Sequence, residues 1–379
     1  PDQVIWETRV KMKNKLIDYI RLQFQENWLK SQGDPSRIMS VLESMNPNAL
    51  IIGFGRRFAT YKRAYLLFTD LKRLSKIVND PAKPVQFIFS GKAHPADQGG
   101  KALIKRIVEV SRMPEFLGKI IFLENYDMHL AKRLISGVDI WLNTPTRPLE
   151  ASGTSGQKAQ MNGVLNFSVL DGWWLEGYVK GAGWAITEKR TYDNDAYQDQ
   201  LDAATIYSML ENEIIPLYFA KNSKGISPEW IQYIKDSIAQ ITPRFTTKRM
   251  IDNYVEQFYT KLSNRHALLK DNNFARAKEI AAWKQKIAKG WDKIEVVSMD
   301  IPEGLLKNPQ VSEVYHMNIV IDIKDINDKG IGIELVITKP DKDNKFYLHD
   351  VEEFKLVKAN GSLLYFSLEY QLNRAGLFQ

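Results

Sequence analysis

One nine-residue stretch combines a carboxylate, several small polar residues and a lysine. It runs from Glu150 to Lys158 with the sequence EASGTSGQK. Thr154, Ser155 and Gly156 place hydroxyls and unobstructed backbone N–H groups where a helix is expected to begin, and a helix N-terminus attracts anions through its unpaired donors and its dipole. Lys158 follows one turn later, where an amino group can hold a phosphate as a point charge or form a Schiff base with a carbonyl cofactor that carries the phosphate. The stretch therefore indicates an anion and sugar site, in which Lys158 can serve as a covalent anchor.

Two further cations, Arg57 and Lys62, flank a turn that leads into a predicted helix. A guanidinium binds an anion as a planar fork, whereas an ammonium group acts as a mobile point charge, so the pair suits two neighbouring phosphates. The alternative interpretation is a solvated basic helix start, because charge clusters are usually exposed surface.

Four stretches, in this order along the chain, resemble the α-glucan (glycogen, starch and maltodextrin) phosphorylase family. They are GRRFATYKR (55–63), FIFSGKA (87–93), IFLENY (121–126) and EASGTSGQK (150–158), and the resemblance covers about residues 1–260. The sequence is similar to the short bacterial and archaeal type of the family, judging from Thr154-Ser-Gly and from Asp171-Gly-Trp-Trp174. Family members carry a whole domain before the point where this chain starts, so we expect the chain to be a carboxyl-terminal part.

The resemblance implies a role for each matching residue. Pyridoxal 5'-phosphate would form a Schiff base with Lys158, Arg57 would clamp the substrate phosphate, and Lys62 would clamp the cofactor phosphate. The other implied cofactor contacts are Thr154, Ser155, Gly156, Tyr126, which would pack on the cofactor ring, and Arg56.

The resemblance also implies a glucosyl pocket. Glu150, Ser152 and Gly153 would line it, and Tyr61 and Asn162 would add further substrate contacts. Taken alone, the same residues also fit ordinary structure: a capped polar loop for Glu150 to Gly153, a surface helix lysine at Lys158, and an aromatic at a sheet edge for Tyr126.

The sequence departs from the family at three positions. Arg56 stands where many members have lysine, which leaves its contact open, and Ala59 and Thr60 replace a His-Glu pair found in the best-known members.

The activity implied by the resemblance is reversible phosphorolysis of α-1,4-glucans to glucose 1-phosphate, with retention, on a GT-B glycosyltransferase fold. The implied partners are an α-1,4-glucan and phosphate, and the family resemblance is compatible with a homo-oligomer. Two alternatives stay open: a nucleotide-sugar-dependent glucan synthase, which would have no use for a cofactor-forming lysine, and a non-catalytic glucan-binding or assembly module.

Composition sets further bounds. A chain of 379 residues with 44% hydrophobic residues is expected to form more than one packed domain. The sequence contains no apolar run of about 18 residues, so no membrane span is predicted. The first residues lack the pattern of a secretory signal. The absence of cysteine excludes disulfide and thiol chemistry and fits the reducing cytoplasm, where we expect the protein to act. The five histidines show no i, i+4 metal-binding pair, so no metal site is predicted.

The net charge of +7 is unevenly distributed. From Lys293 onward there are ten basic against fourteen acidic residues, net −4, and the preceding part has 42 against 31, net +11. No basic run with interleaved aromatics and no nucleic-acid module accompanies this excess, so we expect no nucleic-acid partner.

The hydrophobic pattern predicts an α/β fold. Five short apolar runs read as buried parallel strands, and the segments between them, such as Tyr65–Val78, as helices. This order gives a doubly wound, Rossmann-like sheet with its ligand site at the carboxyl ends of the strands, where the loops carry every motif above. The expected strands are 49–54, 85–89, 119–123, 138–142 and 164–169.

After residue 193 the sequence pattern changes twice, first to helical and then to β-rich. Residues 194–290 have an almost continuously helical pattern. From about Trp291 the chain is β-rich, with strand-like runs such as 316–323, 331–337 and 363–368. We therefore expect an N-terminal helical segment (1–46), a Rossmann-like cofactor and phosphate domain with C-terminal helices (47–290), and a small all-β domain (293–379) that is cut short at its end.

Overall fold

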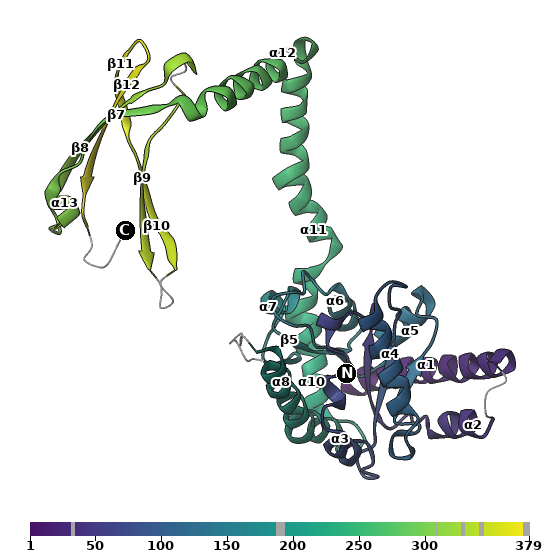
Figure 1. The fold of residues 1–379 in the computed structure, drawn as a ribbon. Helices are drawn as coiled ribbons and strands as arrows, with labels where there is room; N and C mark the ends of the chain where they lie inside the picture. The colour runs from purple at the N-terminus through teal and green to yellow at the C-terminus, as the bar shows by residue number, and fades with distance from the viewer. Residues whose placement is uncertain (32–34, 187–193, 308, 327–329, 341–344, 374–379) are drawn as a thin grey trace. The chain divides into compact units, whose positions relative to one another are not determined.

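The computed structural model describes residues 1–31, 35–186, 194–307, 309–326, 330–340 and 345–373 (Figure 1). The chain divides into two compact units, Pro1–Asn253 and Tyr254–Gln379. The boundary expected from the sequence lies near residue 290, and the three domain ranges given above stay predictions.

A six-stranded sheet forms the centre of the first unit. All its neighbouring strands pair in parallel, in the order β3-β2-β1-β4-β5-β6, which is the strand order of doubly wound dinucleotide-binding folds. The α/β class and the parallel sheet predicted from the sequence are confirmed. Of the six strands of this sheet, the three-residue strand β6 is the one that was not predicted. The strands are β1 (Leu50–Gly55), β2 (Val85–Ser90), β3 (Ile120–Leu123), β4 (Ile140–Asn143), β5 (Leu165–Val169) and β6 (Trp184–Ile186).

Helices cover both faces of this sheet. Since the side chains of a strand alternate between its two faces, each strand packs against helices on both sides. In β1, Leu50, Ile52 and Phe54 pack in one hydrophobic cluster with α3, α8 and α10, whereas Ile51 packs in another cluster with α1 and α5. The helices of this unit are α1 (Asp2–Ser31), α2 (Pro35–Ser44), α3 (Leu71–Val78), α4 (Gln98–Ser111), α5 (Met128–Gly137), α6 (Thr154–Met161), α7 (Trp173–Gly177), α8 (Asp195–Met209), α9 (Ile215–Phe219) and α10 (Pro228–Asp236).

An aspartate directly precedes and caps each of the helices α3, α4 and α5. The carboxylates of Asp70, Asp97 and Asp127 each accept a backbone N–H in the first turn of α3, α4 and α5, at 2.8–2.9 Å. The cap at Asp70 also corrects one prediction. The segment expected as a single helix over Tyr65–Val78 is a short 3-10 turn, Leu66–Phe68, followed by a separate helix α3.

A buried ion pair attaches α1 to the amino ends of the central strands. Lys13 Nζ lies 2.6 Å from Asp139 Oδ2 and also donates to the carbonyl of Ala49 and the hydroxyl of Tyr218. Asp139 Oδ2 accepts the backbone N–H of Ile51 at 2.8 Å, so one carboxylate joins the helix to both β1 and β4. The site described below lies at the opposite ends of these strands.

The second unit begins with helix and ends in antiparallel strands. In α12, residues Asp271 to Phe274 have non-helical backbone angles, and the helix bends there (Figure 1). The strands form a four-stranded sheet, β11-β12-β8-β7, and a two-stranded one, β10-β9. The separate β region predicted from the sequence is confirmed, although β7, β10 and β11 were not predicted. The elements are α11 (Thr247–Tyr254), which crosses the boundary, α12 (Thr260–Gly290), α13 (Glu303–Lys307), β7 (Glu295–Asp300), β8 (Val314–Asp322), β9 (Glu334–Pro340), β10 (Phe346–Glu353), β11 (Lys355–Asn360) and β12 (Leu363–Gln371).

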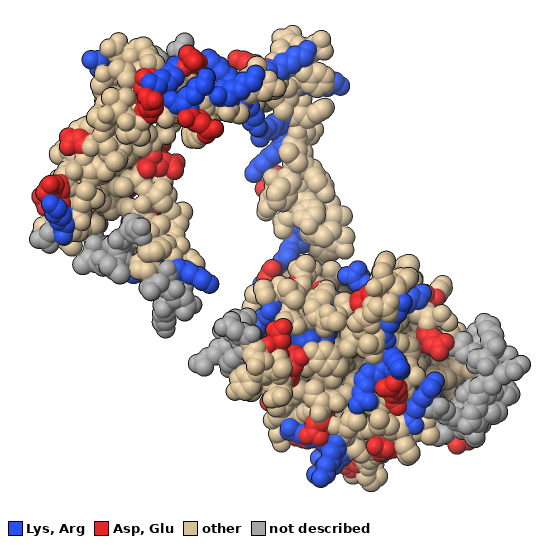
Figure 2. All heavy atoms as spheres, viewed as in Figure 1, with Lys and Arg blue, Asp and Glu red and all other residues tan. Residues whose placement is uncertain are grey.

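Charged side chains of both signs lie interspersed on the face of the first unit seen in Figure 2, and Lys and Arg gather along α12. Among the helices of the described residues, none is long and apolar enough to cross a membrane.

Candidate anion and sugar site

The motifs predicted from the sequence meet at the carboxyl edge of the parallel sheet. In the observed strand order, β1 and β4 are neighbours at the point where the order reverses, and ligands of open α/β sheets bind in the crevice at this point. Arg56 to Lys62 follow β1, and the segment that contains Glu150 to Lys158 follows β4. The fold thus brings together two motifs that lie about ninety residues apart in the sequence.

The carboxylate of Glu150 bridges two of the predicted cations. Its Oε2 lies 2.5 Å from Arg56 Nη2 and also accepts a hydrogen bond from Lys62 Nζ. All three side chains are about nine-tenths buried. Burial alone raises the pKa of Glu150, but the hydrogen bond from Lys62 and the charge of Arg56 outweigh burial, so the pKa lies below its usual value. The carboxylate therefore stays ionised between its two partners at neutral pH.

Arg56 connects this cluster to the sheet. Its Nη1 donates to Asn143 Oδ1, at the end of β4, at 3.0 Å. Burial lowers the pKa of Arg56, and the neighbouring charge of Glu150 opposes this shift. The Nε of Arg56 is buried without a hydrogen-bond partner among the described residues. A buried guanidinium donor without an acceptor is costly, which makes Arg56 Nε a candidate donor to a ligand.

The turn that carries Lys62 is held by the residue that follows it. Arg63 has a left-handed backbone (φ 48°), and its guanidinium is buried. It donates to the carbonyls of Thr144 and Pro145 and pairs with Asp199 and Asp202 at 2.9 and 2.7 Å. All three of its guanidinium nitrogens thereby serve to fix the loop after β1 against the loop after β4 and against α8.

The predicted helix start at Thr154 is confirmed. Gly153 precedes α6 with a left-handed backbone (φ 80°), and Thr154 is the first residue of the helix. Gly156 has no room for a side chain, because a Cβ there would lie 2.7 Å from Asn166 Oδ1 and 2.9 Å from Trp173 Nε1. The hydroxyl of Ser155 accepts a hydrogen bond from Trp141 Nε1 at 3.1 Å. The first turn of α6 therefore packs directly on the sheet.

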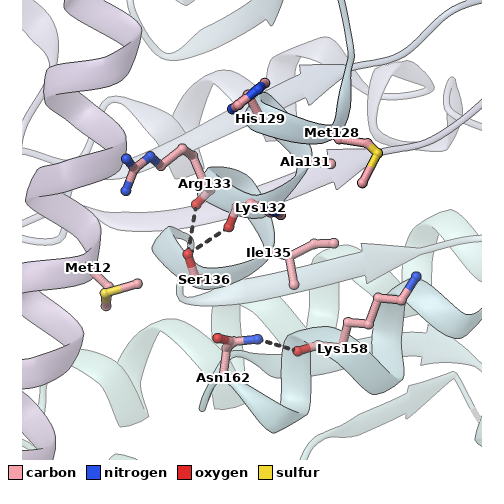
Figure 3. A pocket seen from close by; sticks show the side chains of 10 residues that line it. All are labelled: Met12, Met128, His129, Ala131, Lys132, Arg133, Ile135, Ser136, Lys158 and Asn162. Atoms are coloured by element: carbon pink, nitrogen blue, oxygen red, sulfur yellow. Dashed lines mark hydrogen bonds between the residues drawn. The ribbon is translucent and has the colours of Figure 1, made fainter. Parts of the chain in front are cut away.

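Lys158 lies on the exposed side of α6, where it lines a groove of about 680 Å³ together with residues of α1 and α5. Figure 3 shows its side chain extending away from Asn162. Met128, Lys132 and Ile135 of α5 also line this groove. The amino group is thus accessible, one turn beyond the start of the helix.

Asn162 lies apart from the other predicted substrate residues. It caps the carboxyl end of α6, where its Nδ2 donates to the carbonyl of Lys158 at 2.8 Å. The eight residues of α6 span about 12 Å, so the structure places Asn162 at the far end of the helix from Glu150, Ser152 and Gly153.

The remaining predicted residues lie near the loop after β1. The hydroxyl of Tyr126 approaches the carbonyl of Gly55 at 3.4 Å, and burial raises the pKa of Tyr126. The ring of Tyr61 lies beneath Lys62 Nζ, 4.5 Å from it. Arg57 is exposed, and among the described residues its side chain makes no hydrogen bond or ion pair. The roles assigned to these residues stay predictions.

Two polar residues of the site were missed by sequence reasoning. Asn143 holds Arg56, and Asp171 Oδ2 accepts the backbone N–H of Glu150 at 2.8 Å. Asn143 directly follows an apolar run that predicts a strand, and Asp171 begins the Asp-Gly-Trp-Trp segment after another such run. A polar residue after a predicted strand was therefore the signal that could have identified both residues. Among the described residues, no group of three or more His, Asp or Glu side chains could hold a metal ion.

The fold and the site define a class: a parallel α/β domain in which two cations and a carboxylate gather at the switch point of the strand order. Comparison with known proteins is more specific. Residues 36–179 match the carbohydrate phosphorylase family, and residues 291–379 match the glycogen phosphorylase C-terminal domain. The chain belongs to the α-glucan phosphorylase family.

Individual relatives agree with this assignment. The chain is 48% identical over 296 residues to a maltodextrin phosphorylase of Thermococcus litoralis, an alignment that covers 78% of the chain and 34% of the relative. It is 47% identical over 262 residues to a glycogen phosphorylase of Aquifex aeolicus, covering 69% and 37%. A glycogen phosphorylase of Mycobacterium bovis is 32% identical over 337 residues, covering 89% and 39%. The chain thus spans little more than a third of the length of these relatives.

Proposed function

We propose that this chain provides the phosphate-handling and cofactor-carrying part of an enzyme that performs reversible phosphorolysis of α-1,4-glucans. The main support for this proposal is that Arg56, Lys62 and Glu150 lie together at the carboxyl edge of the sheet, at the switch point of the strand order. Developing negative charge at such a site is stabilised by fixed cations, commonly the largest electrostatic contribution to catalysis. The family of the chain and the names of its relatives support the same reaction.

The residues present fit pyridoxal 5'-phosphate as the cofactor. Lys158 is accessible for covalent attachment, and the first turn of α6 at Thr154 and Ser155 offers helix N-terminal donors for the phosphate. Arg56 retains an unused buried donor, and Tyr126 provides an aromatic surface beside Gly55. When bound, the cofactor would supply a phosphate group that exchanges a proton with the substrate phosphate.

The chain's own residues would then have distinct tasks. Lys62 and Arg56 would gather the anions, while Glu150 keeps these two cations at a fixed separation and offers its carboxylate to sugar hydroxyls. Arg57, exposed at the edge of the crevice, would bind the substrate phosphate as a fork. The proposal includes the GT-B architecture. The first unit would supply one Rossmann-like sheet of that architecture, and the relatives extend far beyond the aligned region.

The central experiment compares two lysines of the same groove. We expect the chain incubated with pyridoxal phosphate to develop an imine absorbance that borohydride fixes, and Lys158→Ala to abolish this signal, because the stretch from Glu150 to Lys158 contains no other lysine. Lys132→Ala is the matched control, since Lys132 is exposed and lines the same groove. An unchanged imine in Lys158→Ala would refute the assignment. Absence of any imine in the wild-type chain would favour a nucleotide-sugar-dependent synthase or a binding module.

A further inference from the structure

The turn after β5 is fitted closely to the loop that carries Glu150. Asp171 Oδ2 accepts the backbone N–H of Glu150, and the backbone N–H of Trp173 donates to the carbonyl of Ser152, both at 2.8 Å. Asp171 is 8% exposed. These two hydrogen bonds, made by Asp171 and Trp173, are called the clasp below.

Gly172, between the two residues of the clasp, makes this close approach feasible. Its backbone has a positive φ of 55°, and a Cβ at this position would lie 2.5 Å from the carbonyl oxygen of Ser152 and 2.9 Å from that of Glu150. No residue with a side chain fits without moving the loop. The turn and the loop are therefore in direct backbone contact on both sides of Gly172.

The clasp determines where the Glu150 side chain starts. The second oxygen of Asp171 accepts the N–H of Gly172 at 2.9 Å, so both carboxylate oxygens bind backbone and the side chain has little freedom to rotate. From the position fixed in this way, Glu150 reaches Arg56 and Lys62. Four residues after Glu150, the same loop begins α6.

We propose that Asp171 is a positioning residue of the anion site, which acts through the backbone of Glu150 and the start of α6. This inference rests on the proposed function, because it assigns Asp171 to the same crevice. A purely structural aspartate would stabilise the fold and leave the anion affinity unchanged. A positioning aspartate controls the affinity, because small displacements of Glu150 alter the spacing of Arg56 and Lys62.

The test uses the whole chain with Asp171→Ala, Asp171→Asn and the control Asp70→Ala. Asp70 also accepts a backbone N–H, at 2.9 Å, but caps α3. Inorganic phosphate binding is measured by calorimetry, and amide hydrogen exchange is followed for residues 149–153. We expect Asp171→Ala to weaken phosphate binding about three- to ten-fold, the equivalent of one hydrogen bond, and to speed exchange in this segment. Asparagine keeps one acceptor oxygen and should restore part of both, and Asp70→Ala should change neither.

Two results would overturn the positioning role: an unchanged phosphate affinity in Asp171→Ala, or an equal loss in Asp70→Ala. Failure of the proposed function looks different. A wild-type chain that binds neither phosphate nor pyridoxal phosphate would contradict that function. The clasp would then be judged by exchange alone, and unchanged exchange of residues 149–153 in Asp171→Ala would refute it.

Discussion

The two units of the chain use their strands in opposite ways. Every residue of β1 in the first unit is buried, whereas every residue of β7 and of β10 in the second unit is exposed. The charge differs too: the first unit has 34 basic against 27 acidic residues, net +7, whereas the second unit has 18 of each, net 0. A sheet buried on both faces can present polar groups only at its strand ends, so the loops there are fixed by buried hydrogen bonds and concentrate the charges. This difference is why the proposed anion chemistry is placed in the first unit.

The largest expected effect concerns how much of the reaction the first unit can perform. We expect the chain as given to form glucose 1-phosphate from maltodextrin at least a thousand-fold more slowly than a full-length relative such as the T. litoralis enzyme. The reason is that the chain aligns with only 34% of that relative, and residues of the relative beyond the aligned region would contribute substrate positioning and exclusion of water, together worth several kcal/mol. Glucose 1-phosphate release, measured side by side at equal concentration, checks this expectation. Comparable turnover would show that the site is complete within this chain.

A second prediction tests whether buried polar contacts hold the first unit more tightly than exposed ones hold the second. Arg63→Ala removes a buried cation and leaves Asp199 and Asp202 without it, so we expect a loss of about 3–5 kcal/mol in the free energy of unfolding. In the second unit, Lys324 pairs with Glu295 and Asp322 at 2.7 and 2.8 Å at a partly exposed position. Lys324→Ala should shift the unfolding midpoint far less. Urea denaturation of both variants makes the comparison, and equal losses would contradict it.

The third prediction concerns Arg57, an exposed cation in the loop after β1. In the full-length protein, Arg57→Ala should weaken the use of phosphate about ten- to hundred-fold, because a charge-assisted hydrogen bond is worth about 1.5–3 kcal/mol. The Michaelis constants for phosphate and for glucan are measured separately. Arg106→Ala, an exposed arginine of α4, serves as the control. A raised glucan constant with an unchanged phosphate constant would show that Arg57 has a different role.

The smallest expected effect is a pH dependence that originates in Glu150. Its pKa in the folded protein is lowered, so its ionised form stabilises the fold above the unfolded-state pKa of about 4.3, and this contribution is lost as the pH falls through the folded pKa. Glu150→Gln should therefore be less stable than the wild type at pH 7, with a difference that shrinks below about pH 4. Urea denaturation between pH 3 and 7 gives both curves, and a difference independent of pH would exclude this role.

The sequence predicted the central strands because each is a continuous apolar run between polar residues, as in β1 and β2. It failed for β7 and β10, whose exposed strands contain charged residues and lack such a run. It also failed for β6, which has only three residues. The helix start at Thr154 was predictable from local chemistry, since Gly153 and the residues after it favour that geometry wherever they occur.

The sequence by itself determined which residues are candidates for the chemistry, namely the cations after β1 and the carboxylate and lysine after β4. It also determined the class of fold that presents them. Only the tertiary structure decided which of them touch. Glu150 pairs with Arg56 and Lys62, Asn143 and Asp171 support that cluster, and Asn162 lies at the other end of α6. The physical reason is that local sequence sets backbone preferences over a few residues. Contacts across ninety residues depend on strand order and on the burial of polar groups that must find partners.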